Sequence, residues 1–208
     1  MNRSRFASRF RFAHSNLSLG PVIVVVTRPK SMLDWLKRGF TQTGDPFAEL
    51  PHYCRVWLAI ETAAHATPLL IQHRPDVPRR QLVYLAAAQR ELRKAITTPS
   101  PNLHRLRRVE RNAIMFAGNA IRLGYPQVST VPKLTGWAGA ALIKGPEESQ
   151  NCLDECASLA YDSTVDLVAP EIWSAIMDRA NCIHDLAARN NWSDTDVVPA
   201  NMMLEQDG

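Results

Sequence analysis

The stretch from residue 102 to residue 124, NLHRLRRVERNAIMFAGNAIRLG, has the features of a complete helix. Asn102 is a residue type that caps helix N-termini, and Gly124 is a type that ends helices. Between them, apolar residues recur at intervals of three and four and form one face. These are Leu106, Val109, Ala113, Phe116, Ala117 and Ala120. The pattern predicts an amphipathic helix over 103–123 that buries this face in a larger assembly of helices.

Prolines divide the rest of the chain into further segments of helical length. Helices are predicted over 31–40, 51–66, 76–97, 146–161 and 170–190, and a short helix or buried segment over 137–143. Pro68 is expected to end or kink the helix that begins at Pro51. Residues 125–136 are expected to form a loop or short strand, and residues 163–165 a turn or strand. The predicted fold class is all-α, a single helical bundle of five to six helices with a basic, potentially mobile N-terminal segment.

Length and composition fit one soluble domain. The chain has 208 residues, of which 46% are hydrophobic and 21% charged, which is enough apolar material for a core. No apolar run approaches the roughly 18 residues of a membrane span. We predict a basic N-terminal arm or targeting segment over 1–31, a helical domain over 32–192 and an acidic tail over 193–208.

The sequence leaves three interpretations of residues 1–31 open. The segment is rich in Arg and Ser and lacks acids, as organellar transit peptides do. It can equally be a basic arm followed by a strand over 21–27, or the product of a start assigned too far upstream of Met32. Four cysteines in a chain of this length are too few for a disulfide framework. A reducing, cytoplasmic location is therefore expected, with organellar targeting by residues 1–31 as the alternative.

Charge is divided unevenly along the chain. Residues 1–33 hold six basic residues and no acid, residues 34–144 have a net charge of +9, and residues 145–208 have a net charge of −11. Within residues 79–122, ten Lys or Arg stand against two Glu. If the two predicted helices of this region are antiparallel neighbours, their non-core sides form one basic surface. We predict that it binds nucleic acid or an acidic partner through Arg90, Arg93, Lys94, Arg107, Arg108 and Arg111. The alternative is that the acidic C-terminal third neutralises this surface within the same fold.

The sequence contains no catalytic or cofactor motif of useful specificity. G-x-S-x-G, H-E-x-x-H, a P-loop and G-x-G-x-x-G are all absent, so catalytic residues are unknown and no cofactor is expected. Glycines of the 136–145 stretch lack phosphate-loop spacing and indicate tight helix packing. Cys152 and Cys156 lie one helical turn apart and could join Cys182 and His184 around a metal. Buried thiols and a core histidine are the preferred interpretation, and no metal site is predicted.

The leading functional hypothesis is a non-enzymatic helical interaction protein with a protein partner, a subunit or accessory of a larger assembly. The first alternative is a sequence-nonspecific nucleic-acid-binding protein that uses the basic surface of residues 79–122. That region has only Tyr84 and Phe116 as aromatics, which gives no stacking platform for single strands. The second alternative is a small helical enzyme whose site assembles only in three dimensions. The sequence indicates no oligomeric state and no resemblance to a known family.

Overall fold

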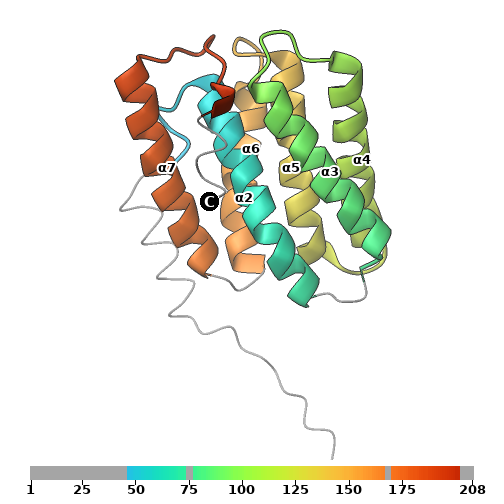
Figure 1. Ribbon diagram of the computed structural model, residues 1–208. Helices are drawn as coiled ribbons and strands as arrows, with labels where there is room; N and C mark the ends of the chain where they lie inside the picture. The colour runs from blue at the N-terminus through green and yellow to red at the C-terminus, as the bar shows by residue number, and fades with distance from the viewer. Residues whose placement is uncertain (1–45, 74–76, 167–169, 202–208) are drawn as a thin grey trace, which may run out of the picture.

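The computed structural model describes residues 46–73, 77–166 and 170–201, and it confirms the all-α prediction. Six α-helices and one short 3-10 helix make up this part of the chain (Figure 1). They are α2 (His52–His73), α3 (Arg79–Ile96), α4 (Leu103–Arg122), η1 (Pro126–Ser129), α5 (Thr130–Lys144), α6 (Gln150–Asp166) and α7 (Pro170–Asn190). The segment 1–31, the helix predicted over 31–40 and residues 202–208 of the predicted tail lie outside the described residues.

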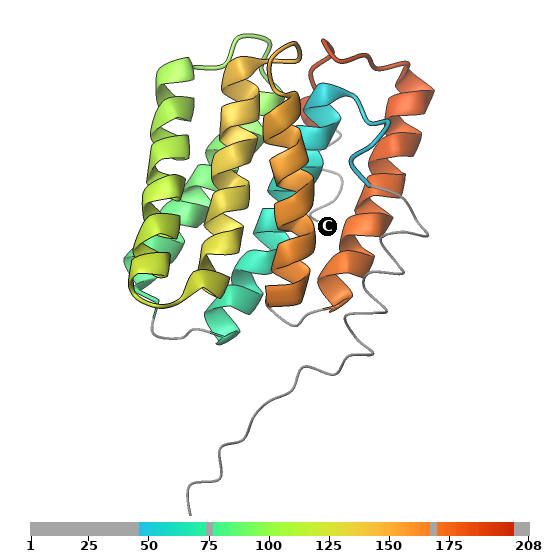
Figure 2. The ribbon, with the colours of Figure 1, turned by 180° about the vertical axis from the view of Figure 1, so that it is seen from behind.

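Two helices, α2 and α5, form the centre of the bundle. Helix α2 packs against α3, α5, α6 and α7, and α5 packs against α2, α3, α4 and α6. Helices α4 and α7 lie on opposite sides of the molecule, as the front and back views agree (Figures 1 and 2). Helix α4 holds five Arg and one Glu, whereas α7 holds three acids and two Arg, so basic charge is concentrated on the α4 side.

The central position of α2 follows from its composition. Five consecutive residues, 56–60, are each at most 1% exposed, and they include Trp57 and Leu58. Five consecutive positions cover every direction around an α-helix, so this segment is buried on all sides. A helix that is apolar all round is stable only in the middle of a bundle.

Helix α2 continues through Pro68 to His73, where the sequence predicted an end near Ala66. A proline in a helix interior costs about 3 kcal/mol. Leu70, in the turn that follows, is completely buried, and burying a leucine side chain stabilises by about 1.5–3 kcal/mol. The core contact of the last turn therefore offsets the proline, and the prediction of a helix end was wrong.

The structure also corrects the predictions for residues 125–136 and 163–165. Helix α5 begins at Thr130, so residues 130–136, expected to be loop or strand, continue as one helix into the predicted 137–143 segment. Val131, Leu134 and Ala138 are completely buried at helical spacing, which explains the longer helix. Helix α6 begins at Gln150 rather than Pro146 and runs through residues 163–165 to Asp166.

Side-chain hydrogen bonds allow hydroxyl residues inside α6, and a glycine allows α5 to pack closely on α4. Ser163 and Thr164 each donate a side-chain hydrogen bond to the Ala160 carbonyl, at 2.9 and 3.2 Å, which keeps both hydroxyls inside the helix. A Cβ at Gly136 would stand 3.3 Å from the Ile114 side chain of α4. The predicted role of the glycines in tight helix packing is confirmed at this position.

The chain that follows α7 forms a strap, residues 193–198, across the end of the bundle. The Asp194 carboxylate accepts the backbone N–H of His52 at 2.6 Å, at the start of α2. The backbone N–H of Val198 donates to the Ile96 carbonyl at 3.1 Å, at the end of α3, and the Val198 side chain is completely buried. The first part of the predicted acidic tail therefore joins the ends of three helices.

Replacing Asp194 by alanine is expected to lower the free energy of unfolding by about 0.5–2 kcal/mol. The substitution removes a side-chain acceptor from the N-terminus of α2, where backbone N–H groups have no partner within the helix. Urea unfolding monitored by circular dichroism measures the change. Asp185, an exposed residue of α7, provides the control variant Asp185→Ala, and an equal loss in both variants would contradict the capping role.

Candidate functional site

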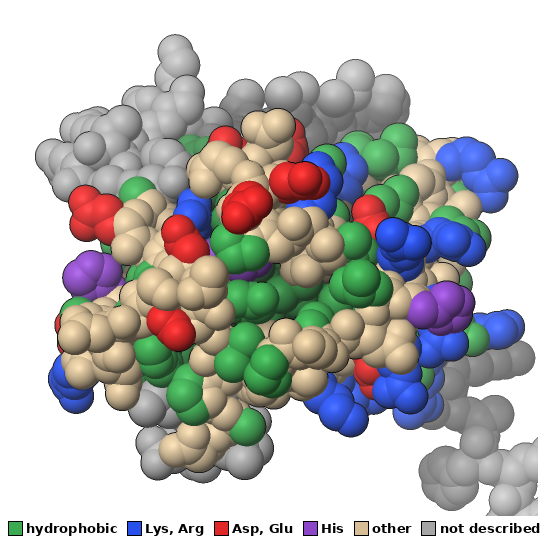
Figure 3. Space-filling model, turned by 90° about the horizontal axis from the view of Figure 1, so that it is seen from above, with side chains coloured by type: hydrophobic (Ala, Val, Ile, Leu, Met, Phe, Trp, Pro, Cys, Tyr) green, Lys and Arg blue, Asp and Glu red, His purple; other side chains and the backbone are tan. Residues whose placement is uncertain are grey.

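The basic residues predicted as a binding surface gather at one end of the bundle. Helices α3 and α4 pack together, and the turn between them places the last turns of α3 beside the first turns of α4 (Figure 1). An ion pair of 3.7 Å between Arg105 and Glu91 joins the two helices there. Figure 3 looks down on this end and shows blue side chains crowded over one side of it. We call this region the basic end, and its exposed bases other than the paired Arg105 are Arg90, Lys94, Arg107, Arg108 and Arg111.

These five residues are exposed and form no ion pair with any acid of the described residues. The ion pairs within that part of the chain join Arg55 to Asp194, Arg93 and Arg179 to Glu61, and Arg105 to Glu91. None of them links a base of α3 or α4 to an acid of α6 or α7. Neutralisation of the basic surface by the acidic third, the alternative derived from the sequence, is thus not found in the described residues.

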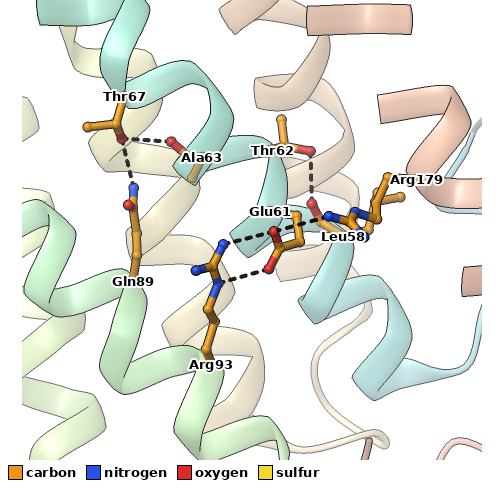
Figure 4. Close-up of polar contacts among 8 residues, drawn as sticks. All are labelled: Leu58, Glu61, Thr62, Ala63, Thr67, Gln89, Arg93 and Arg179. Carbon is orange, nitrogen blue, oxygen red and sulfur yellow. Dashed lines mark hydrogen bonds and ion pairs between the residues drawn. The ribbon is translucent and has the colours of Figure 1, made fainter. Parts of the chain in front are cut away.

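Arg93, the sixth predicted residue, has a different environment. Its Nε and Nη2 donate to the two carboxylate oxygens of Glu61 on α2, both at 2.8 Å (Figure 4). Arg179 of α7 reaches the same carboxylate at 3.8 Å (Figure 4). Arg93 therefore ties α3 to α2 rather than adding to the exposed charge of the basic end. Sequence reasoning missed Glu61, although an acid within a nearly all-apolar helix signals a partnered position.

Replacing Glu61 by glutamine is expected to destabilise the bundle by about 1–2 kcal/mol. The variant keeps the shape of the side chain but leaves two half-buried arginines without a charged acceptor. Thermal unfolding compared with the exposed variant Glu147→Gln measures the effect. Equal melting temperatures for the two variants would show that the Arg93–Glu61–Arg179 cluster adds nothing to stability.

The outer face of α4 also carries large exposed apolar side chains, both before and beyond Arg111. Large apolar side chains that are 38–61% exposed concentrate on α4 and its neighbours. They are Val83 and Tyr84 on α3, Leu103, Ile114, Met115, Ile121 and Leu123 in or next to α4, and Trp137 on α5. All eight lie on or directly after three helices that pack together, α3, α4 and α5, and apolar side chains that gather on a surface mark interaction sites. The sequence carried the signal, since Ile114, Met115 and Ile121 fall outside the buried stripe of α4.

A cleft of about 460 Å³ lies between α3 and α4 beside this apolar face. Its lining combines buried apolar residues, Leu85, Ala88, Ala113 and Phe116, with the partly exposed rim residues Arg80, Gln81, Tyr84, Asn112, Met115 and Asn119. Arg80 donates two hydrogen bonds to the Tyr84 hydroxyl, at 3.2 and 3.1 Å, and its guanidinium stands 5.5 Å from the centre of the tyrosine ring. The cleft was not predicted from the sequence.

A larger groove of about 910 Å³ runs between α2, α3 and α7. Its apolar lining includes Leu58, Leu69 and Ile176, and its charged residues include the Glu61 cluster. The two arginines of this groove, Arg93 and Arg179, are engaged by Glu61 within the fold. The groove therefore offers less uncompensated charge than the basic end.

His52 and Cys54 lie in buried positions that hold both side chains in their neutral forms. His52 is 1% exposed, and its Nδ1 lies 3.0 Å from the hydroxyl of Ser149, which is also buried. Burial lowers the pKa of His52 to about 4, with Arg55 adding to the shift and Asp194 opposing it. Burial also raises the pKa of the Cys54 thiol to about 12. Both groups are therefore neutral near pH 7.

The predicted burial of Cys152 and Cys156 is confirmed, but His184 is exposed on α7 and the prediction of a core histidine was wrong. Within residues 46–73, 77–166 and 170–201, no three or more His, Cys, Asp or Glu side chains are grouped so that they could hold a metal ion. None of the helices in the same ranges has both the length and the apolar composition needed to cross a bilayer.

No protein-family model, curated protein or solved structure matches this chain. The geometry alone defines its class: an all-α bundle with six helices in its described part, in which α4 is strongly basic.

Proposed function

We propose that this chain is a non-enzymatic interaction protein, a subunit or accessory of a larger assembly, which docks an acidic protein segment on α3 and α4. The observation that carries the proposal is the basic end, where five exposed Lys or Arg side chains lack an acidic partner among the described residues. Concentrated charge of one sign attracts a partner of the opposite sign and orients it during encounter.

The apolar half of α4 favours a protein partner over nucleic acid. A phosphate backbone is bound through cations and hydrogen-bond donors, and it gains nothing from exposed apolar side chains such as Met115 and Ile121. A protein segment can cover both the basic end and these apolar side chains. Protein interfaces combine an apolar centre with a charged rim in this way.

Binding of a defined acidic helix tests the proposal. We define the Leu peptide as a synthetic helix of about 16 residues, roughly 24 Å long, built from Glu and Ala with two leucines near its middle. We expect the wild-type chain to bind it at about 50 mM salt and to lose about tenfold in affinity by about 200 mM salt, because salt screens exposed charges. Fluorescence anisotropy of the labelled peptide measures both values.

A peptide with every Glu replaced by Lys is the matched control and is expected not to bind. Absence of Leu-peptide binding at low salt would overturn the proposal, as would equal binding of the two peptides.

A further inference from the structure

We propose that the cleft between α3 and α4 is the anchor site of the docking surface, and that it holds the apolar side chains of one acidic helix about three turns long. This inference rests on the proposed function and specifies the chemistry of the partner. The occupant has acids toward its ends and large aliphatic or aromatic side chains in its middle.

Two rows of side chains form the walls of the cleft. On α4, Arg108, Asn112, Met115 and Asn119 follow one another at intervals of four, three and four, so they share one face of the helix. Three of these four line the cleft directly, and Arg108 extends the row toward the basic end. On α3, Arg80 and Tyr84 form the facing wall.

One end of the cleft lining is basic, its floor is apolar, and a base follows beyond the other end. Arg80 lies at one end, held by its hydrogen bonds to Tyr84. Beyond the other end, Arg108 adds an exposed charge one helical turn from Asn112, whereas Arg105 is already paired with Glu91. Eleven positions separate Arg108 from Asn119 in the facing row, a distance of about 16 Å along α4. A helix of about three turns spans the same distance and can place an acid near each end.

The residue types at the rim are those of protein interfaces. Tyr84 is 50% exposed and Met115 is 59% exposed, so each leaves apolar surface that a partner could bury. Tyr, Arg and Met are enriched at interfaces, and the flexible Met side chain adapts to different partners. Below them, Leu85 and Phe116 provide a buried apolar floor. The cleft volume of about 460 Å³ lies within the range of about 300–1,000 Å³ that is typical of ligand pockets.

A helix is the occupant that this shape favours, because a groove between two helices accepts the ridge of a third helix. Its acids complement Arg80 and the basic end, while its apolar side chains enter the middle. A nucleic-acid backbone matches the two ends but offers no group for the apolar middle.

The test compares the Leu peptide with an Ala peptide, in which alanines replace its two leucines and no charge changes. We expect the wild-type chain to bind the Leu peptide about tenfold more tightly. The double variant Y84S/M115S should bind both peptides equally, because any change caused by releasing Arg80 from Tyr84 affects the two peptides alike. Both substituted side chains are half exposed or more, so the fold is retained, which thermal unfolding checks.

Ile114 provides the matched control. It is 55% exposed and directly precedes Met115 in the sequence. Its side chain packs toward Gly136 of α5 and does not line the cleft. The variant Ile114→Ser is expected to keep the preference for the Leu peptide. A wild-type chain that binds both peptides equally would overturn the anchor site and leave the proposed function standing. Binding of neither peptide would overturn the proposed function as well, and loss of the preference in Ile114→Ser but not in Y84S/M115S would move the anchor elsewhere.

Discussion

Reversing three arginines of the basic end, in the variant R107E/R108E/R111E, is expected to weaken binding of the Leu peptide by about 100-fold at about 50 mM salt. Each substitution removes an attraction and adds a repulsion, together about 1 kcal/mol for an exposed site. Three sites give about 3 kcal/mol, and each 1.4 kcal/mol is a factor of ten. Isothermal titration calorimetry measures the change directly.

The control variant K133E/K144E/R189E changes the net charge by the same amount. Its three residues lie outside α3 and α4, so the control is expected to weaken binding less than about fivefold through long-range charge alone. If both triple variants lose affinity equally, the peptide responds to net charge and the basic end is not a docking surface.

Acidification from about pH 6.5 to about pH 4 is expected to lower the free energy of unfolding by about 3 kcal/mol through His52 alone. The pKa of this histidine falls from 6.5 to about 4 on folding, mainly because of burial. Between those two values the unfolded chain takes up a proton that the folded chain does not, so stability falls by about 1.4 kcal/mol per pH unit. Above about pH 6.5 and below about pH 4, this group adds no pH dependence.

The variant His52→Asn isolates that contribution, because its side-chain amide can replace Nδ1 in the hydrogen bond with Ser149 but does not titrate. Urea unfolding between about pH 6.5 and pH 5, where most carboxylates remain ionised, should show a clearly smaller slope for this variant than for wild type. The exposed, non-titrating variant Asn181→Ala should keep the wild-type slope. Equal slopes for wild type and His52→Asn would mean that His52 titrates normally in the fold.

The helices that the sequence predicted best are those with local signals at their ends. Asn102 caps α4 as expected, accepting the Arg105 N–H at 3.1 Å, and Gly124 has a φ of 83° beyond its end. Local signals failed at Pro68, at residues 130–136 and at residues 163–165. At the first two sites, burial against other helices outweighs the local preference, and no short stretch of sequence reports that burial.

The candidate site was predictable only where it depends on one helix. The exposure of Arg107, Arg108 and Arg111 follows from the helical period of α4. The pairing of Arg93 with Glu61 joins residues 32 positions apart and depends on how α3 packs on α2. The anchor cleft depends in the same way on the contact between α3 and α4.

Direct competition between the Leu peptide and a DNA duplex of about 16 base pairs, at about 150 mM salt, tests the central claim that α3 and α4 dock an acidic protein segment. We predict that the peptide binds more tightly than the duplex. R107E/R108E/R111E should weaken both ligands, and Y84S/M115S should weaken the peptide alone. Tighter binding of the duplex, with no effect of Y84S/M115S on either ligand, would contradict the claim and assign the basic end to nucleic acid.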